Sequence, residues 1–150
     1  MIKSINDLLP NEQKWLAKTA TSILLSDTSH KENQASFIQA LFKTYFDEEP
    51  VELLSEIYVL LEKGIKPKIE EIDIADPDKM VFMLDILSAS VFANGKRLHL
   101  ETERYFEAGK KLSLRLGILS YRLSLEVEKE RVKRKLTLLS HDIRKELKEE

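Results

Sequence analysis

The segment from Asp76 to Ala93 constrains the fold more than any other part of the chain. Asp76 followed by Pro77 is the clearest helix start in the sequence, because aspartate caps the first free N–H groups and proline has no N–H to lose. The apolar residues that follow lie on most sides of the expected helix: Met80, Val81, Met83, Leu84, Leu87 and Val91. A helix that is apolar on most sides is buried, so we expect this one at the centre of an all-α core.

Helical periodicity extends over most of the remaining chain. It predicts helices over about residues 10–25, 50–63, 100–112 and 114–149, and another that ends near Phe46. The longest stretch without helical period is "GIKPKIEEIDIADPDK", residues 64–79. We expect its isoleucines to hold it against the helical body.

Composition limits the classes of protein that fit this pattern. A chain of 150 residues is expected to form one domain with a sizeable core. Charged residues make up 33%, and cysteine is absent, which excludes disulfides and thiolate zinc sites. The first 15 residues lack the apolar region of a signal peptide, and no apolar run reaches the roughly 18 residues that cross a bilayer. We therefore expect a cytoplasmic protein without a transmembrane segment.

The last segment is long and charged, and it carries one apolar stripe. The stripe has the 4, 3 and 4 spacing of a coiled coil and consists of Val132, Leu136, Leu139 and Ile143. Lys129 and Glu146 stand where apolar residues would continue it. We expect residues 120–150 to form a long helix that either packs on the domain of residues 1–119 or pairs with a second copy.

Charge is distributed unevenly along the chain. Residues 47–78 carry 11 acidic and 3 basic side chains, a net of −8, whereas residues 129–135 carry 5 basic and 1 acidic, a net of +4. This basic set could contact nucleic-acid phosphates or an anionic membrane surface: Lys129, Arg131, Lys133, Arg134 and Lys135. No aromatic residue lies among them for base stacking, and a solvated helix surface with acid–base pairs explains them as well.

The two halves of the chain share a weak internal repeat. The stretches "ILLSDTSHKENQASFIQALFKTYF" and "VFANGKRLHLETERYFEAGKKLSL" each run from an apolar helix through a polar turn and acidic residues to a helix with aromatics. Such a repeat predicts two helical hairpin units in one bundle. Residues 84–114 resemble the TerB-like (tellurite-resistance B, DjlA-type) helical domain, whose hallmark is Ala-Asp-Gly, an aliphatic residue in the turn and a glutamate opening the next helix. Ala93-Asn94-Gly95, Leu98 and Glu101 or Glu103 occupy the matching places.

The resemblance implies an all-α fold of two pseudo-repeated hairpin units and a role in stress-linked assemblies. It also implies that acidic loop and helix residues bind a divalent cation in members with metal sites. The corresponding residues here are Asp27, Glu32, Asn94, Glu101 and Glu103. Asn94 replaces the family's aspartate and cations follow it, whereas hard metal ions require several oxygens and usually net negative charge. The turn after Ala93 is therefore either a tight joint between two helices or an ion site.

No pattern in the sequence indicates catalysis. The chain lacks phosphate-binding glycine loops, HExxH and a nucleophile elbow, and the adjacent Ser140, His141 and Asp142 point in different directions on a helix. We expect a non-enzymatic interaction or adaptor module that resembles TerB-like stress-response domains, has an unidentified protein partner and can form a homodimer through its C-terminal helix. The alternatives are a divalent-cation-binding stress protein, the cation being the one cofactor considered, and a nucleic-acid-associated helical protein.

Overall fold

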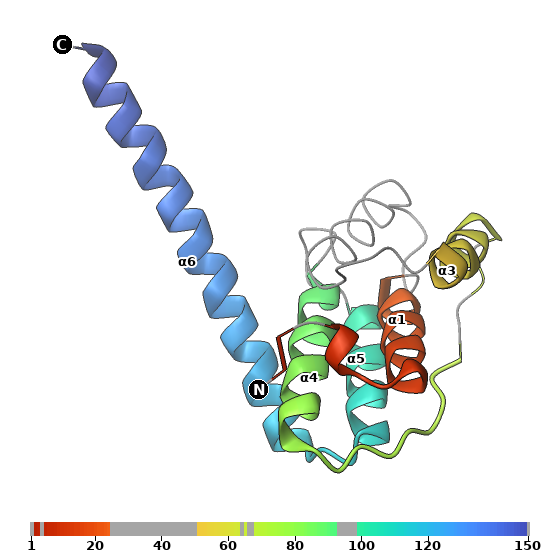
Figure 1. Ribbon diagram of the computed structural model, residues 1–150. Helices are drawn as coiled ribbons and strands as arrows, with labels where there is room; N and C mark the ends of the chain where they lie inside the picture. Colours follow the sequence, from red (N-terminus) through yellow and green to blue (C-terminus); the bar gives the residue numbers. More distant parts are fainter. Residues whose placement is uncertain are drawn as a thin grey trace. The chain divides into compact units, whose positions relative to one another are not determined.

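The computed structural model describes residues 2–3, 5–24, 51–63, 65, 68–92 and 99–149, and the regular structure in this part is helical throughout (Figure 1). A short 3-10 helix, η1, spans Ile5–Asp7. The α-helices are α1 (Pro10–Leu24), α3 (Val51–Lys63), α4 (Pro77–Val91), α5 (His99–Lys111) and α6 (Leu116–Glu149). The predicted all-α class with a long C-terminal helix is confirmed for the described residues.

Two other predictions fall outside the described residues. These are the helix that ends near Phe46 and the turn at Asn94-Gly95. Both belong to the internal repeat, so the two pseudo-repeated hairpin units stay a prediction. By its internal contacts the chain divides into two compact units, Met1–Leu116 and Gly117–Glu150.

Helices α1, α4 and α5 pack against one another and enclose the core of the first unit (Figure 1). Seven large side chains in these helices are fully buried: Leu16, Ile23, Leu24, Met83, Ile86, Leu87 and Tyr105. Removing an aliphatic side chain of this size from water contributes about 1.5–3 kcal/mol, so these contacts dominate the stability of the bundle. None of the described helices is long and apolar enough to cross a membrane.

Helix α4 starts as predicted and lies centrally in this core. The Oδ1 atom of Asp76 accepts a hydrogen bond of 2.9 Å from the backbone N–H of Asp78, and Pro77 is the first helical residue. The expectation that α4 is apolar and buried on most sides is wrong at two positions. Val81 is 60% exposed and Met80 is half-buried. The reason is that α4 packs on α1 and α5, which leaves one side of the helix facing solvent.

The side chain of Trp15 joins the segment before α4 to α1. The indole N–H of Trp15 donates a hydrogen bond of 2.8 Å to the backbone carbonyl of Glu70. Ile69 and Ile74 are buried on either side of this contact, and Ile72 is half-buried. Trp15 is therefore the anchor of an extended segment with no helical hydrogen bonds of its own.

Helix α5 ends at Lys111, close to the predicted end at residue 112, in a tight turn whose left-handed residue the sequence pattern does not predict. Ser113 has a φ of 61°, the only positive value among the described residues other than glycine. The backbone N–H of Leu114 donates to the carbonyl of Gly109 at 3.0 Å, and that of Ser113 donates to the carbonyl of Lys110 at 2.9 Å. These two bonds form a Schellman motif with serine at the position that glycine normally takes.

Candidate functional site

The residues of the predicted ion site divide into two groups. Asp27, Glu32 and Asn94 lie outside the described residues. Glu101 is 1% exposed in the first turn of α5, whereas the side chain of Glu103 is 62% exposed and forms an ion pair of 2.9 Å with His99. Two residues that are two positions apart on a helix lie on nearly opposite sides, so these carboxylates do not converge.

No other cluster replaces this site in the part of the chain that the structure describes. Its histidine and acidic residues nowhere form a group of three or more that could hold a metal ion. The predicted ion site, which depends on the three residues outside that part, stays a prediction.

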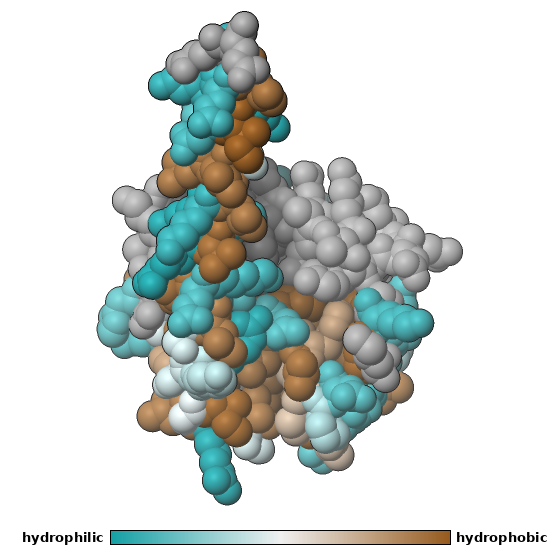
Figure 2. Space-filling view, turned by 90° about the vertical axis from the view of Figure 1, so that its left-hand side faces the viewer, coloured by the Kyte–Doolittle hydropathy of each residue, from teal (hydrophilic) through white to brown (hydrophobic). Residues whose placement is uncertain are grey.

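The apolar stripe of α6 is the most distinctive surface in the described residues. Every side chain from 131 to 148 is exposed, and the exposed fractions of the stripe residues are 55%, 59%, 55% and 49% for Val132, Leu136, Leu139 and Ile143. At about 100° per residue, these four positions fall within about 60° of the helix circumference. Figure 2 shows apolar side chains following one another along α6 beside a row of hydrophilic ones.

The basic set lies on the same helix but does not form one face. Lys129, Arg131, Lys133, Arg134 and Lys135 are all exposed. At about 100° per residue, they spread over about two thirds of the helix circumference. A helix that binds a phosphate backbone concentrates its cations on the side it presents. Contact with a nucleic acid or an anionic surface through these residues stays a prediction.

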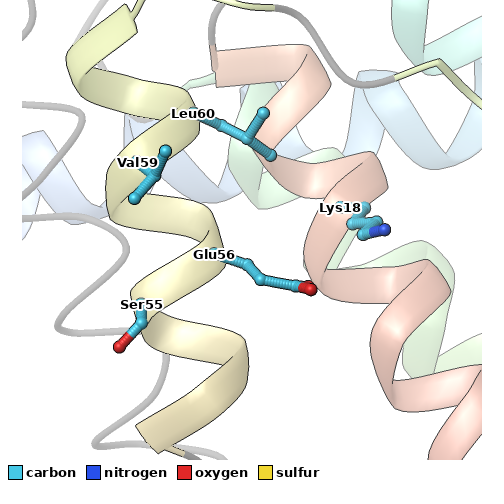
Figure 3. A pocket seen from close by; sticks show the side chains of 5 residues that line it. All are labelled: Lys18, Ser55, Glu56, Val59 and Leu60. Carbon is cyan, nitrogen blue, oxygen red and sulfur yellow. The ribbon is translucent and has the colours of Figure 1, made fainter.

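A hollow lies between α1 and α3 in the first unit. It has a volume of 470 Å³ and is lined by Lys18, Ser55, Glu56, Val59 and Leu60. Figure 3 shows Glu56 and Leu60 extending from α3 toward α1, while Ser55 lies on another side of α3. Its ionisable lining residues are one lysine and one glutamate, and Figure 3 shows the Ser55 side chain directed away from both.

The structure adds the exposure of the stripe to the sequence pattern of α6. The periodicity predicts the apolar stripe, but it does not show that the stripe residues are exposed. It also presents Lys129 and Glu146 only as interruptions, although they bound the stripe at its two ends with opposite charges. Their signal in the sequence is the symmetry of their placement, three residues before Val132 and three residues after Ile143.

Comparisons of the chain with protein-family models, characterised proteins and solved structures find no match.

Proposed function

We propose that this chain is a non-enzymatic protein-interaction module of the cytoplasm whose binding surface is the apolar stripe of α6. The observation that carries the proposal is the exposure of the stripe: four aliphatic side chains on one helix face are each about half exposed. A row of exposed aliphatic residues with polar borders is typical of a surface that another protein covers. The stripe also has coiled-coil spacing, which favours a helix as the covering element.

The energetics support the same proposal. Covering the exposed part of each stripe residue removes apolar area from water at about 25 cal/mol per Å², so the four residues together favour association. The polar side chains around the stripe keep the uncovered helix hydrated. The resemblance to TerB-like stress-response domains is consistent with an adaptor role and remains part of this proposal.

The two alternative functions stay predictions. Divalent-cation binding depends on Asp27, Glu32 and Asn94, which lie outside the described residues, together with Glu101 and Glu103. Nucleic-acid binding depends on cations that spread around α6. Neither has a surface as well defined as the apolar stripe.

Site-specific photo-crosslinking tests the proposal with a matched control. A benzophenone amino acid replaces Leu139 on the stripe, or Leu138, which is 65% exposed and lies about 100° away on the same helix. After irradiation in the cell, we expect a protein adduct from position 139 and little or none from position 138. Equal adducts from both positions, or none from position 139, would refute the proposed function.

A further inference from the structure

The charges at the two ends of the apolar stripe indicate what covers it. Lys129 precedes the stripe and Glu146 follows it, both in register with its coiled-coil spacing. When two α6 helices pair through the stripe, Lys129 and Glu146 of one helix each lie opposite a position of the same coiled-coil repeat on the other helix. The orientation of the pair therefore decides whether like or opposite charges meet.

In an antiparallel pair, every residue of the stripe lies opposite another residue of the stripe when Leu136 of one copy faces Leu139 of the other. In this register Val132 faces Ile143, so all four residues of the stripe meet apolar partners. The next layer outward on each side brings Lys129 of one copy against Glu146 of the other. Four apolar layers are then closed at both ends by an attractive charge pair, which is the arrangement that fixes register in coiled coils.

Other pairings of the same helices lose this match. A parallel pair in register places Lys129 against Lys129 and Glu146 against Glu146. A flanking contact between Glu128 of one copy and Lys133 of the other offsets part of this repulsion. An antiparallel pair shifted by one heptad places either Glu146 or Lys129 against a leucine of the stripe. Like charges in facing positions disfavour association, and so does a charge set against an apolar layer.

One pair of residues beside the stripe, Lys135 and Asp142, favours the same antiparallel register. Lys135 and Asp142 precede the stripe residues Leu136 and Ile143, which puts both in the flanking position of the repeat. Flanking residues of this kind meet each other across an antiparallel pair. Here Lys135 of one copy lies near Asp142 of the other, twice in the symmetric dimer, and both side chains are exposed in the single chain.

We infer that a second copy of this chain covers the apolar stripe, with the two α6 helices antiparallel and Lys129 of each copy facing Glu146 of the other. This inference rests on the proposed function and names its partner. The paired region from 129 to 146 spans about 27 Å at 1.5 Å per residue. Its two-fold symmetry makes the interface closed, so it forms dimers and does not extend into fibres.

Disulfide mapping on the full chain tests the orientation, because the protein has no cysteine of its own. The variants are Val132→Cys and Ile143→Cys, oxidised separately and as an equimolar mixture. We expect a disulfide-linked dimer in the mixture and almost none in either variant alone, since residue 132 faces residue 143 only across an antiparallel pair. A mixture of Leu138→Cys and Ile143→Cys is the control and should stay unlinked.

Charge reversal tests the register without changing the apolar layers. Lys129→Glu and Glu146→Lys each turn two attractive contacts into two repulsive ones, so each should weaken dimerisation roughly 10- to 30-fold. The double variant restores opposite charges and should dimerise like the wild-type chain. Dimer dissociation constants from sedimentation equilibrium measure these effects.

The outcomes separate this inference from the proposed function. Two results would overturn the antiparallel register. One is a disulfide-linked dimer of each cysteine variant oxidised alone, and the other is a single charge reversal that leaves the dimer dissociation constant unchanged. If the adduct at position 139 contains a different protein and the chain stays monomeric, a second copy is not the partner, although the stripe is still an interaction surface. No adduct at position 139 and no dimer would refute both.

Discussion

The carboxylate of Glu12 joins the start of α1 to α4, and its removal should measurably destabilise the first unit. Glu12 is 5% exposed and is the third residue of α1. Its Oε1 atom accepts a hydrogen bond of 2.7 Å from the backbone N–H of Leu9, as in a capping box, and another of 2.9 Å from Nζ of Lys79. One oxygen therefore satisfies a helix end and neutralises a lysine from a distant segment.

The expected loss of unfolding free energy in Glu12→Ala follows from these two contacts. In Glu12→Ala the loss of the capping bond costs about 1 kcal/mol. The loss of the charged hydrogen bond costs about another 1.5 kcal/mol, at the low end of its range because the Lys79 side chain is still 19% exposed to water. We expect the free energy of unfolding to fall by about 2–3 kcal/mol, which lowers the Tm of a chain of this size by roughly 5–10 °C.

A double-mutant cycle with Lys79→Met separates the two contributions. Urea denaturation followed by circular dichroism, with the fluorescence of the single Trp15 as a second probe, gives the four unfolding free energies. The coupling between the two positions should be about 1–2 kcal/mol. Glu103→Ala removes an exposed carboxylate from its ion pair with His99, and this control should change stability by less than about 0.5 kcal/mol. Equal effects of the Glu12 and Glu103 substitutions would show that the two contacts of Glu12 do not stabilise the first unit.

Three further substitutions test other parts of the fold. Trp15→Phe removes the donor to the carbonyl of Glu70 and part of a buried ring, so it should cost about 1–3 kcal/mol in urea denaturation and speed tryptic cleavage of the segment before α4; unchanged cleavage would contradict this anchor. Ser113→Gly relieves an L-residue at a φ of 61° and should stabilise the chain by about 1 kcal/mol, so a lower Tm would argue against the described turn. Leu87→Ala, at a fully buried position, should cost about 2–5 kcal/mol, whereas Val81→Ala at a 60% exposed position should cost less than about 0.5 kcal/mol, both from calorimetric melts; similar losses would contradict the orientation of α4.

Features that depend on neighbouring residues could be predicted from the sequence. The start of α4 is one of them, because Asp76 and Pro77 act on N–H groups within the next turn. The range of α1 is another, since Leu16 and Ile23 recur at helical spacing on its buried face. In both cases the physical cause lies within a few residues of the feature.

Features that depend on contacts between distant residues could not be predicted from the sequence. The sequence around Val81 is as apolar as that around Leu87, and only the positions of α1 and α5 decide which of the two is buried. The bond between Glu12 and Lys79 joins residues 67 positions apart, and no local pattern records it. Serine at position 113 carries no glycine signal, so the left-handed conformation at this residue could not be predicted, although the break between the two helices was.

The apolar stripe of α6 could be predicted from the sequence only in part. Its apolar spacing on α6 is a local pattern that the sequence displays fully. Whether such a stripe packs within its own chain or remains available to a partner depends on tertiary structure. Leu136 and Leu139 are 59% and 55% exposed, and this exposure makes the stripe a candidate interface.

Sedimentation equilibrium of the purified chain measures whether a second copy covers the apolar stripe. If a second copy covers it, the average mass rises from 17.4 kDa toward twice that value as the concentration increases over about 1–300 µM. Leu139→Asp should hold the chain at the monomer mass, whereas Leu138→Asp, on the neighbouring face of the same helix, should dimerise like the wild-type chain. A mass of 17.4 kDa at every concentration, or equal effects of the two substitutions, would contradict the claim that a second copy covers the apolar stripe.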